Sequence, residues 1–133
     1  MIKQIAVFLE NKAGKASACC KVMKDAGVNL YAISIADTTD FGILRAITAD
    51  NATAIAALKN AGYIATEVEM VAFEVPDKAG ALSDILIALG DAGVNVEYMY
   101  SYAGVDGHAK IALKTANVQT AIALLEKMGA TIL

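Results

Sequence analysis

The chain has 133 residues, of which 57% are hydrophobic and 19% charged, so it can bury a sizeable core and is not disordered. Its net charge is −3 and its single arginine is Arg45, which argues against nucleic-acid binding, because such binding rests on clustered basic charge. No apolar run has membrane-spanning length and the N-terminus lacks a signal peptide's apolar region, so we expect a cytoplasmic protein.

The first half of the chain predicts alternating strands and helices. An apolar run bounded by a polar turn favours a strand at residues 2–9. Apolar side chains at helical spacing then predict a helix that ends at Gly27, a residue typical of the position after a helix C-terminus. The other predicted elements are a strand at 29–36, a turn at 37–40, a strand at 42–49, a helix that Asn51 can cap, and a strand at 63–67.

The second half of the chain predicts the same order of elements. Leu82, Ile85, Leu86 and Leu89 form the apolar stripe of a helix. The other predicted elements are a strand at 69–75, a strand at 95–102, a turn at 103–107, a strand at 108–115, a helix capped by Asn117 and ended by Gly129, and a strand at 130–133.

Two sequence motifs recur at one offset. Lys12-Ala13-Gly14 recurs 66 residues later as Lys78-Ala79-Gly80, and residues 25–29 recur at the same offset as residues 91–95. From residue 53 onward the offset becomes 67. A fixed offset across separated motifs implies a duplicated structural unit. The predicted domains, with no linker between them, are residues 1–67 and 68–133.

The order βαββαβ in each half predicts an α+β fold, in which a four-stranded antiparallel sheet carries two helices on one face, the ferredoxin-like arrangement. This architecture hosts many functions, so individual residues must decide between them. An RNA-recognition motif needs stacking aromatics on its central strands, which offer only Phe8. A heavy-metal carrier needs spaced cysteines in the first loop, but Cys19 and Cys20 lie within the helix. An acylphosphatase-like enzyme needs an arginine in that loop, but Arg45 lies on the third strand.

The remaining comparison rests on the loop before each first helix and on the start of the next strand. Residues 10–14 with residues 26–30 resemble the pattern of the ACT domain, and residues 76–80 with residues 92–96 resemble it equally well. The resemblance spans essentially the whole chain as two tandem ACT units. The family pattern usually has a proline before the loop glycine, where this chain has alanine.

The resemblance implies sensing of a small ligand, most often an amino acid, at interfaces between ACT units. A glycine at the strand-to-helix turn lets a ligand approach the backbone, and the helix N-terminus that follows suits a carboxylate. In the family, the asparagine at the start of the second strand contacts ligand across the interface. The predicted ligand-binding residues are Asn11, Lys12, Ala13, Gly14, Asn29, Leu30, Asp77, Lys78, Ala79, Gly80, Asn95 and Val96.

Structural alternatives stay open at these positions. Gly14 and Gly80 can be turn glycines without a ligand, and the asparagines at the strand starts can simply cap the turn. The first repeat is the better candidate, because the neutral Asn11 can both donate and accept hydrogen bonds. Asp77 would repel a carboxylate, or is simply a solvated loop acid.

Three aromatic residues mark a difference between the repeats. Tyr98, Tyr100 and Tyr102 alternate and therefore share one face of a strand, which is either a packed sheet face or an interaction surface. His108, the only histidine, is expected to have a surface or turn role. The adjacent cysteines Cys19 and Cys20 are expected to be reduced and to pack within the helix.

The sequence contains no candidate catalytic triad, metal-ligand cluster or phosphate-binding loop, so we predict no catalytic activity, no metal and no cofactor. The predicted function is a regulatory sensor that binds an amino acid and changes its association with itself or with a partner. The alternative is a non-catalytic regulatory subunit that contacts a metabolic enzyme. The expected partners are an amino acid, a second copy of the chain in a homodimer and, under the alternative, a metabolic enzyme, without nucleic acid or membrane.

Overall fold

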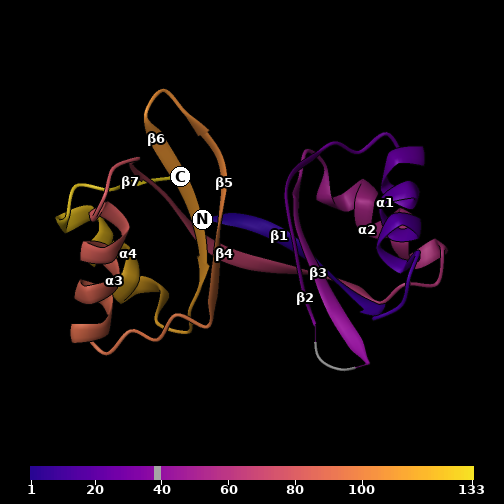
Figure 1. Cartoon of the computed structure of the whole chain (residues 1–133), viewed down its shortest axis with the longest axis horizontal. Coiled ribbons are helices and arrows are strands. Elements are labelled where there is room, and N and C mark those ends of the chain that lie inside the picture. The colour runs from indigo at the N-terminus through magenta and orange to yellow at the C-terminus, as the bar shows by residue number, and fades with distance from the viewer. Residues whose placement is uncertain (38–39) are drawn as a thin grey trace. The chain divides into compact units, whose positions relative to one another are not determined.

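The computed structural model describes residues 1–37 and 40–133, except for the side chains of Asp37 and residues 103–105. The predicted turn at residues 37–40 therefore lies partly outside the described residues. The chain forms two compact units (Figure 1). The first unit comprises residues 3–68, and the second unit comprises residues 69–133 together with Met1 and Ile2. The N-terminal amine of Met1 donates to the carbonyl of Leu133 at 2.7 Å, which explains why the first two residues join the second unit.

The first unit is a two-layer structure in which both helices lie on one face of the sheet (Figure 1). Its strands are adjacent in the order β2-β3-β1-β4, and β3 pairs antiparallel with both β1 and β2. The Phe8 N–H donates to the Ile64 carbonyl at 3.1 Å just before β4 begins. The elements are β1 (Ile2–Glu10), α1 (Lys15–Asp25), β2 (Leu30–Asp37), β3 (Phe41–Thr48), α2 (Asn51–Asn60) and β4 (Ala65–Pro76).

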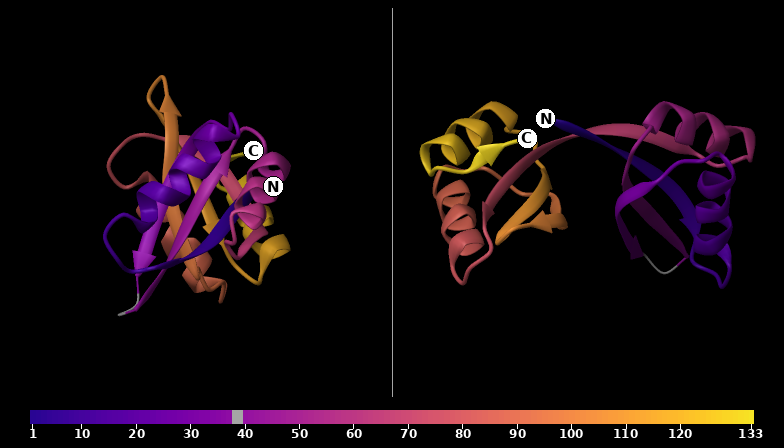
Figure 2. Two further views of the ribbon diagram at one scale, coloured as in Figure 1. Left: turned by 90° about the vertical axis from the view of Figure 1, so that its right-hand side faces the viewer. Right: turned by 90° about the horizontal axis from the view of Figure 1, so that it is seen from above.

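The second unit repeats this construction with β4 in the place of β1. The order is β5-β6-β4-β7, and neighbouring strands pair antiparallel. Figure 2 shows the helix pair and the sheet of each unit from two further directions. The further elements are α3 (Ala81–Asp91), β5 (Tyr98–Val105), β6 (His108–Lys114), α4 (Val118–Lys127) and β7 (Thr131–Ile132). Each unit thus has the ferredoxin-like βαββαβ topology that the sequence predicts.

The junction between the halves differs from the prediction. The two strands expected at residues 63–67 and 69–75 form one continuous strand, β4, of 12 residues. Its sequence contains no glycine and only one proline, Pro76, at the end, so nothing forces a turn.

Two other predicted boundaries are wrong. Asp50, and not Asn51, caps α2, because its Oδ1 accepts a hydrogen bond from the Thr53 N–H at 3.0 Å. Strand β5 continues through Val105, so the turn expected at residues 103–107 shortens to Asp106 and Gly107. Their φ values of 52° and 75° are those that a two-residue hairpin turn requires.

Each unit has its own hydrophobic core between sheet and helices. Alternate residues of the central strands point into these cores, as Val7 and Leu44 do in the first unit and Phe73 and Leu113 in the second. Cys19 lies fully buried in the first core, where burial and, to a smaller extent, the neighbouring Cys20 raise its pKa to about 11. Both cysteines are free thiols.

Candidate functional site

The two predicted ligand loops have the same backbone conformation. Gly14 and Gly80 adopt φ values of 83° and 89°, in the left-handed region that favours glycine. Each is the N-cap residue of the helix that follows, and neither α1 nor α3 receives a side-chain cap. A Cβ atom at either glycine would meet nothing within 4 Å, so the backbone conformation, not crowding, is what calls for glycine.

Backbone hydrogen bonds hold both loops in the same way. The Asn11 N–H donates to the Asp40 carbonyl at 2.9 Å, and the Asp77 N–H donates to the Gly107 carbonyl at 2.7 Å. Both bonds attach the loop to the chain just before the third strand of its repeat. The loop position is therefore a property of the fold that the two units share.

Asn29 and Asn95 do not lie beside the loop of their own unit. Helix α1 has 11 residues and is thus about 16 Å long, and Asn29 follows its end whereas residues 11–14 precede its start. The same separation applies to α3 and Asn95. Both asparagines are exposed, and Asn29 lines a shallow hollow at the end of α1. A ligand that touches a loop and an asparagine would therefore need them from different ACT units.

The other two predicted strand-start residues contribute to the cores. Leu30 and Val96 are partly buried, and each packs against the core of its own unit. Their side chains thus have a structural role whether or not a ligand contacts them.

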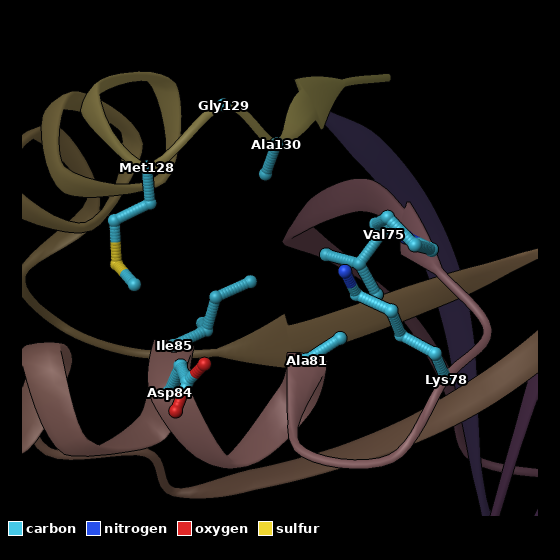
Figure 3. A pocket seen from close by; sticks show the side chains of 9 residues that line it. Val75, Lys78, Ala81, Asp84, Ile85, Met128, Gly129 and Ala130 are labelled. Atoms are coloured by element: carbon cyan, nitrogen blue, oxygen red, sulfur yellow. The ribbon is translucent and has the colours of Figure 1, made fainter.

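A hollow lies at the loop end of each unit, between the start of the first helix and the end of the second. The first hollow has a volume of about 380 Å³ and the second about 190 Å³. Figure 3 shows the second hollow. Six repeat-equivalent pairs line the two hollows: Leu9 and Val75, Glu10 and Pro76, Lys15 and Ala81, Ala61 and Met128, Gly62 and Gly129, and Tyr63 and Ala130.

The rims of the two hollows differ in chemistry. Phe8, Phe41 and Ile64, which are 53%, 57% and 66% exposed, surround the first hollow with apolar surface. Both hollows have two opposite charges in their lining, Glu10 and Lys15 in the first and Lys78 and Asp84 in the second, but Glu10 is already paired with Lys12.

Among the described residues, a lysine at the same loop position forms an ion pair in the first unit and none in the second. Lys12 Nζ lies 3.2 Å from Glu10 Oε2, and the hydrogen bond and positive charge of Lys12 lower the pKa of Glu10. In the second unit Pro76 occupies the position of Glu10, so the equivalent Lys78 lacks this carboxylate and lines the hollow instead.

Of the residues predicted to bind a ligand, Lys78 lines the second hollow and none lines the first. Asn11 and Asp77, the residues on which the two repeats were ranked, line neither hollow. Asp84 and Met128 were overlooked, although comparing the repeats shows that Asp84 stands where the first copy has Ala18. This difference between the repeats is the sequence feature that could have indicated Asp84.

The tyrosine row lies where the alternation predicts. Tyr98, Tyr100 and Tyr102 are half-buried, opposite residues 110–114 of β6, on the sheet face away from the helices. Burial and, to a smaller extent, the charge of Glu74 raise the pKa of Tyr102. Because the row is half-buried, its geometry fits both the packing and the interaction alternatives.

His108 is exposed at the start of β6, and its Nδ1 lies 3.2 Å from the Asp106 carbonyl. Within the described residues, no group of three or more histidine, cysteine, aspartate or glutamate side chains could hold a metal ion. No helix of that part of the chain is long and apolar enough to cross a membrane.

The sequence matches the family described as ACT domain pair over residues 1–129, and the chain therefore belongs to this family. The resemblance inferred from the two loops is confirmed. ACT domains are regulatory domains that bind ligands, so the chain belongs to a regulatory class of protein.

Solved structures agree with this assignment. A protein from Bacteroides thetaiotaomicron shares 35% identity and a TM-score of 0.90, over 99% of this chain and 91% of that one. The ligand-free regulatory subunit of aspartate kinase from Thermus thermophilus has 12% identity and a TM-score of 0.70, over 95% of this chain and 91% of that one. The regulatory subunit of aspartate kinase from Thermus flavus has 15% identity and a TM-score of 0.67, over 96% of this chain and 90% of that one. At these identities the two kinase subunits share the fold alone. Among curated proteins, none matches the sequence.

Proposed function

We propose that this protein is a non-catalytic, cytoplasmic sensor that binds an amino acid and thereby changes its association with itself or with a partner. The observation that carries the proposal is that α1 and α3 both begin at a left-handed glycine without a side-chain cap. Helix α2, by contrast, begins at Asp50, whose carboxylate already accepts a hydrogen bond from the first turn. The N–H groups of Lys15 and Ala81 already donate to the Lys12 and Lys78 carbonyls, so those of the next two residues of each helix are the ones suited to a ligand carboxylate.

The proposed ligand lies at an interface between ACT units. A loop and the asparagine of the same unit are separated by the length of a helix, so one unit cannot supply both to one ligand. The proposed site takes residues 11–14 or 77–80 from one unit and Asn29 or Asn95 from another. Its amide and backbone groups match the carboxylate and ammonium groups of an amino acid.

A second copy of the chain is the proposed partner, and β2 supports it. Strand β2 lies at the edge of its sheet, and its Ile33 and Ile35 pair with Ala46 and Leu44, which are fully buried on the helix side. Yet Ile33 and Ile35 are about half exposed. An edge strand without charged or proline residues at this stretch is open to association. A homodimer would cover these side chains.

Regulation by contact with a metabolic enzyme is the alternative, and the same apolar row on β2 favours it. The two similar Thermus structures are regulatory subunits of aspartate kinase, so the fold occurs in proteins of that kind. Sedimentation separates the alternatives: Ile35→Asp should reduce the mass of a self-associating protein and leave a monomer unchanged.

A thermal-shift screen of the amino acids tests the sensor function. An amino acid present at about 100 times its dissociation constant should stabilise the protein by roughly 2.7 kcal/mol. Asn11→Ala and Asn29→Ala should then reduce the shift more than Asp77→Ala does. If no amino acid raises the unfolding temperature, the sensor function is wrong and regulation by contact remains.

A further inference from the structure

The second hollow is built from the second unit alone. Its floor and walls come from the end of β4, from the first turns of α3 and from the residues after α4 (Figure 3). Val75, Ile85 and Met128 provide apolar surface. The volume of about 190 Å³ lies below the range of roughly 300–1,000 Å³ that is usual for pockets of drug-sized ligands. The hollow is therefore suited to a molecule with a short side chain and is too small for a drug-sized ligand.

Two opposite charges face this hollow without neutralising each other. Lys78 reaches toward it from the loop after β4, and Asp84 faces it from the first turn of α3 (Figure 3). Among the described residues, neither side chain takes part in an ion pair. Lysine and aspartate are therefore both available to a ligand that carries one charge of each sign.

Three sequence differences between the repeats produce this arrangement. Pro76 replaces Glu10, which removes the carboxylate that holds the equivalent lysine in the first unit. Asp84 replaces Ala18 and adds the negative charge, and Ala81 replaces Lys15, which removes a long side chain from the lining. All three differences act on one hollow, and together they change which charges line it, so that Lys78 and Asp84 stand in place of Lys15 and Glu10.

We propose that the second hollow is a binding site for an aliphatic α-amino acid, built within the second unit and sharing only Lys78 with the proposed interface site. The ligand carboxylate contacts Lys78 Nζ, its ammonium group contacts the Asp84 carboxylate, and its side chain packs on Val75, Ile85 and Met128. Charge-assisted hydrogen bonds of this kind are the stronger class in proteins. The inference rests on the proposed function, because it takes the ligand to be an amino acid. It places this binding site in the second repeat, whereas the sequence favours the first.

Isothermal titration with L-alanine, L-valine and L-leucine tests the site in the full-length chain. Lys78→Ala and Asp84→Ala should each weaken binding about tenfold or more, because each removes one charged partner. Both side chains are exposed, so the fold should survive, and circular dichroism checks this. Lys59→Ala, at an exposed lysine outside both loops and both hollows, is the control and should leave the affinity within twofold.

Two further probes test the recognition of both charges and the space available. Isovaleric acid and isobutylamine each lack one charged group of L-valine and should bind at least tenfold more weakly than L-valine does. Ala81→Lys places the first unit's residue in the hollow and should abolish binding. An analogue that binds as tightly as L-valine, or full binding by Ala81→Lys, would overturn the proposal.

Asp84 separates this proposal from the interface site, since it belongs to the hollow alone. An amino acid that binds the wild type and Asp84→Ala equally well, but loses affinity with Asn29→Ala, would overturn the second hollow and leave the sensor function intact. If only charged or aromatic amino acids bind, the ligand class is wrong. If none of the twenty amino acids binds the wild type, the hollow and the sensor function are both wrong.

Discussion

The two units position a lysine in the same loop, yet within the part of the chain that the structure describes only the lysine of the first unit has an ion-pair partner. Lys12 lies 3.2 Å from Glu10, whereas Lys78 follows a proline and faces a hollow. The backbones of the two loops nevertheless match, with glycine φ values of 83° and 89° and the same hydrogen bond to the chain before the third strand. The comparison shows that the fold fixes where a site lies, while a few side chains decide whether its charges are available.

The cores provide the largest expected difference between the units. Phe73 and Val7 occupy equivalent, fully buried positions in the second and first cores. Phe73→Ala should lower the free energy of unfolding by about 3–5 kcal/mol, because it leaves a large cavity, and Val7→Ala by about 2 kcal/mol. Urea denaturation measures both. A loss below about 1 kcal/mol for Phe73→Ala would show that the second core relaxes around the cavity.

The loop glycines should respond alike, since their backbones match. Gly14→Val and Gly80→Val should each cost about 1–2 kcal/mol, because a β-branched residue is strained in the left-handed region even where space is open. Gly90 is the control: it lies inside α3, and a Cβ there meets nothing within 4 Å. Gly90→Ala should stabilise the protein by about 0.5–1 kcal/mol. Unequal losses at the two loop glycines would contradict the shared backbone.

Restoring the missing carboxylate should make the second loop resemble the first. Pro76→Glu gives Lys78 the neighbour that Lys12 has, and it should weaken amino-acid binding up to about fivefold, the range of an exposed ion pair. Isothermal titration measures the change, with Pro76→Gln as the neutral control. Equal affinity in the two variants would mean that Lys78 does not need to be unpaired.

The smallest effect concerns the pH response of Glu10. Its pKa lies below the ordinary value of 4.5, first because of the hydrogen bond with Lys12. This interaction therefore stabilises the folded state above the pKa of the unfolded chain, and the stabilisation is lost as pH falls through the folded pKa. Lys12→Met should raise the pKa of Glu10 toward 4.5, as observed by NMR titration of its carboxyl carbon. An unchanged pKa would mean that Lys15 alone sets the value.

The fold was largely accessible from the sequence, because the repeat and the apolar periodicity both reflect burial on one face. The continuous β4 was also accessible in principle, since residues 65–75 contain no turn residue. The sequence could not show that Asp50, rather than Asn51, is the N-cap of α2. Both residue types are good N-caps, and only the hydrogen bond to Thr53 distinguishes them.

The candidate site was accessible only in part. The loops follow from a local motif that contains Lys78. The second hollow joins residues 75–85 to residues 128–130, which are far apart in the sequence and meet only when the helices pack. Asp84 therefore had no local signal, and only its contrast with Ala18 distinguishes it.

Both cysteines of the chain lie in α1, so thiol chemistry reports on the first unit alone. The positions equivalent to Cys19 and Cys20 in the second unit are Ile85 and Leu86. Cys19 is fully buried and its pKa is about 11, so a thiol reagent should reach it as a thiolate only when the first unit opens. The rate of Cys19 modification, with and without an amino acid, would thus show whether a ligand bound in the second unit changes how often the first unit opens.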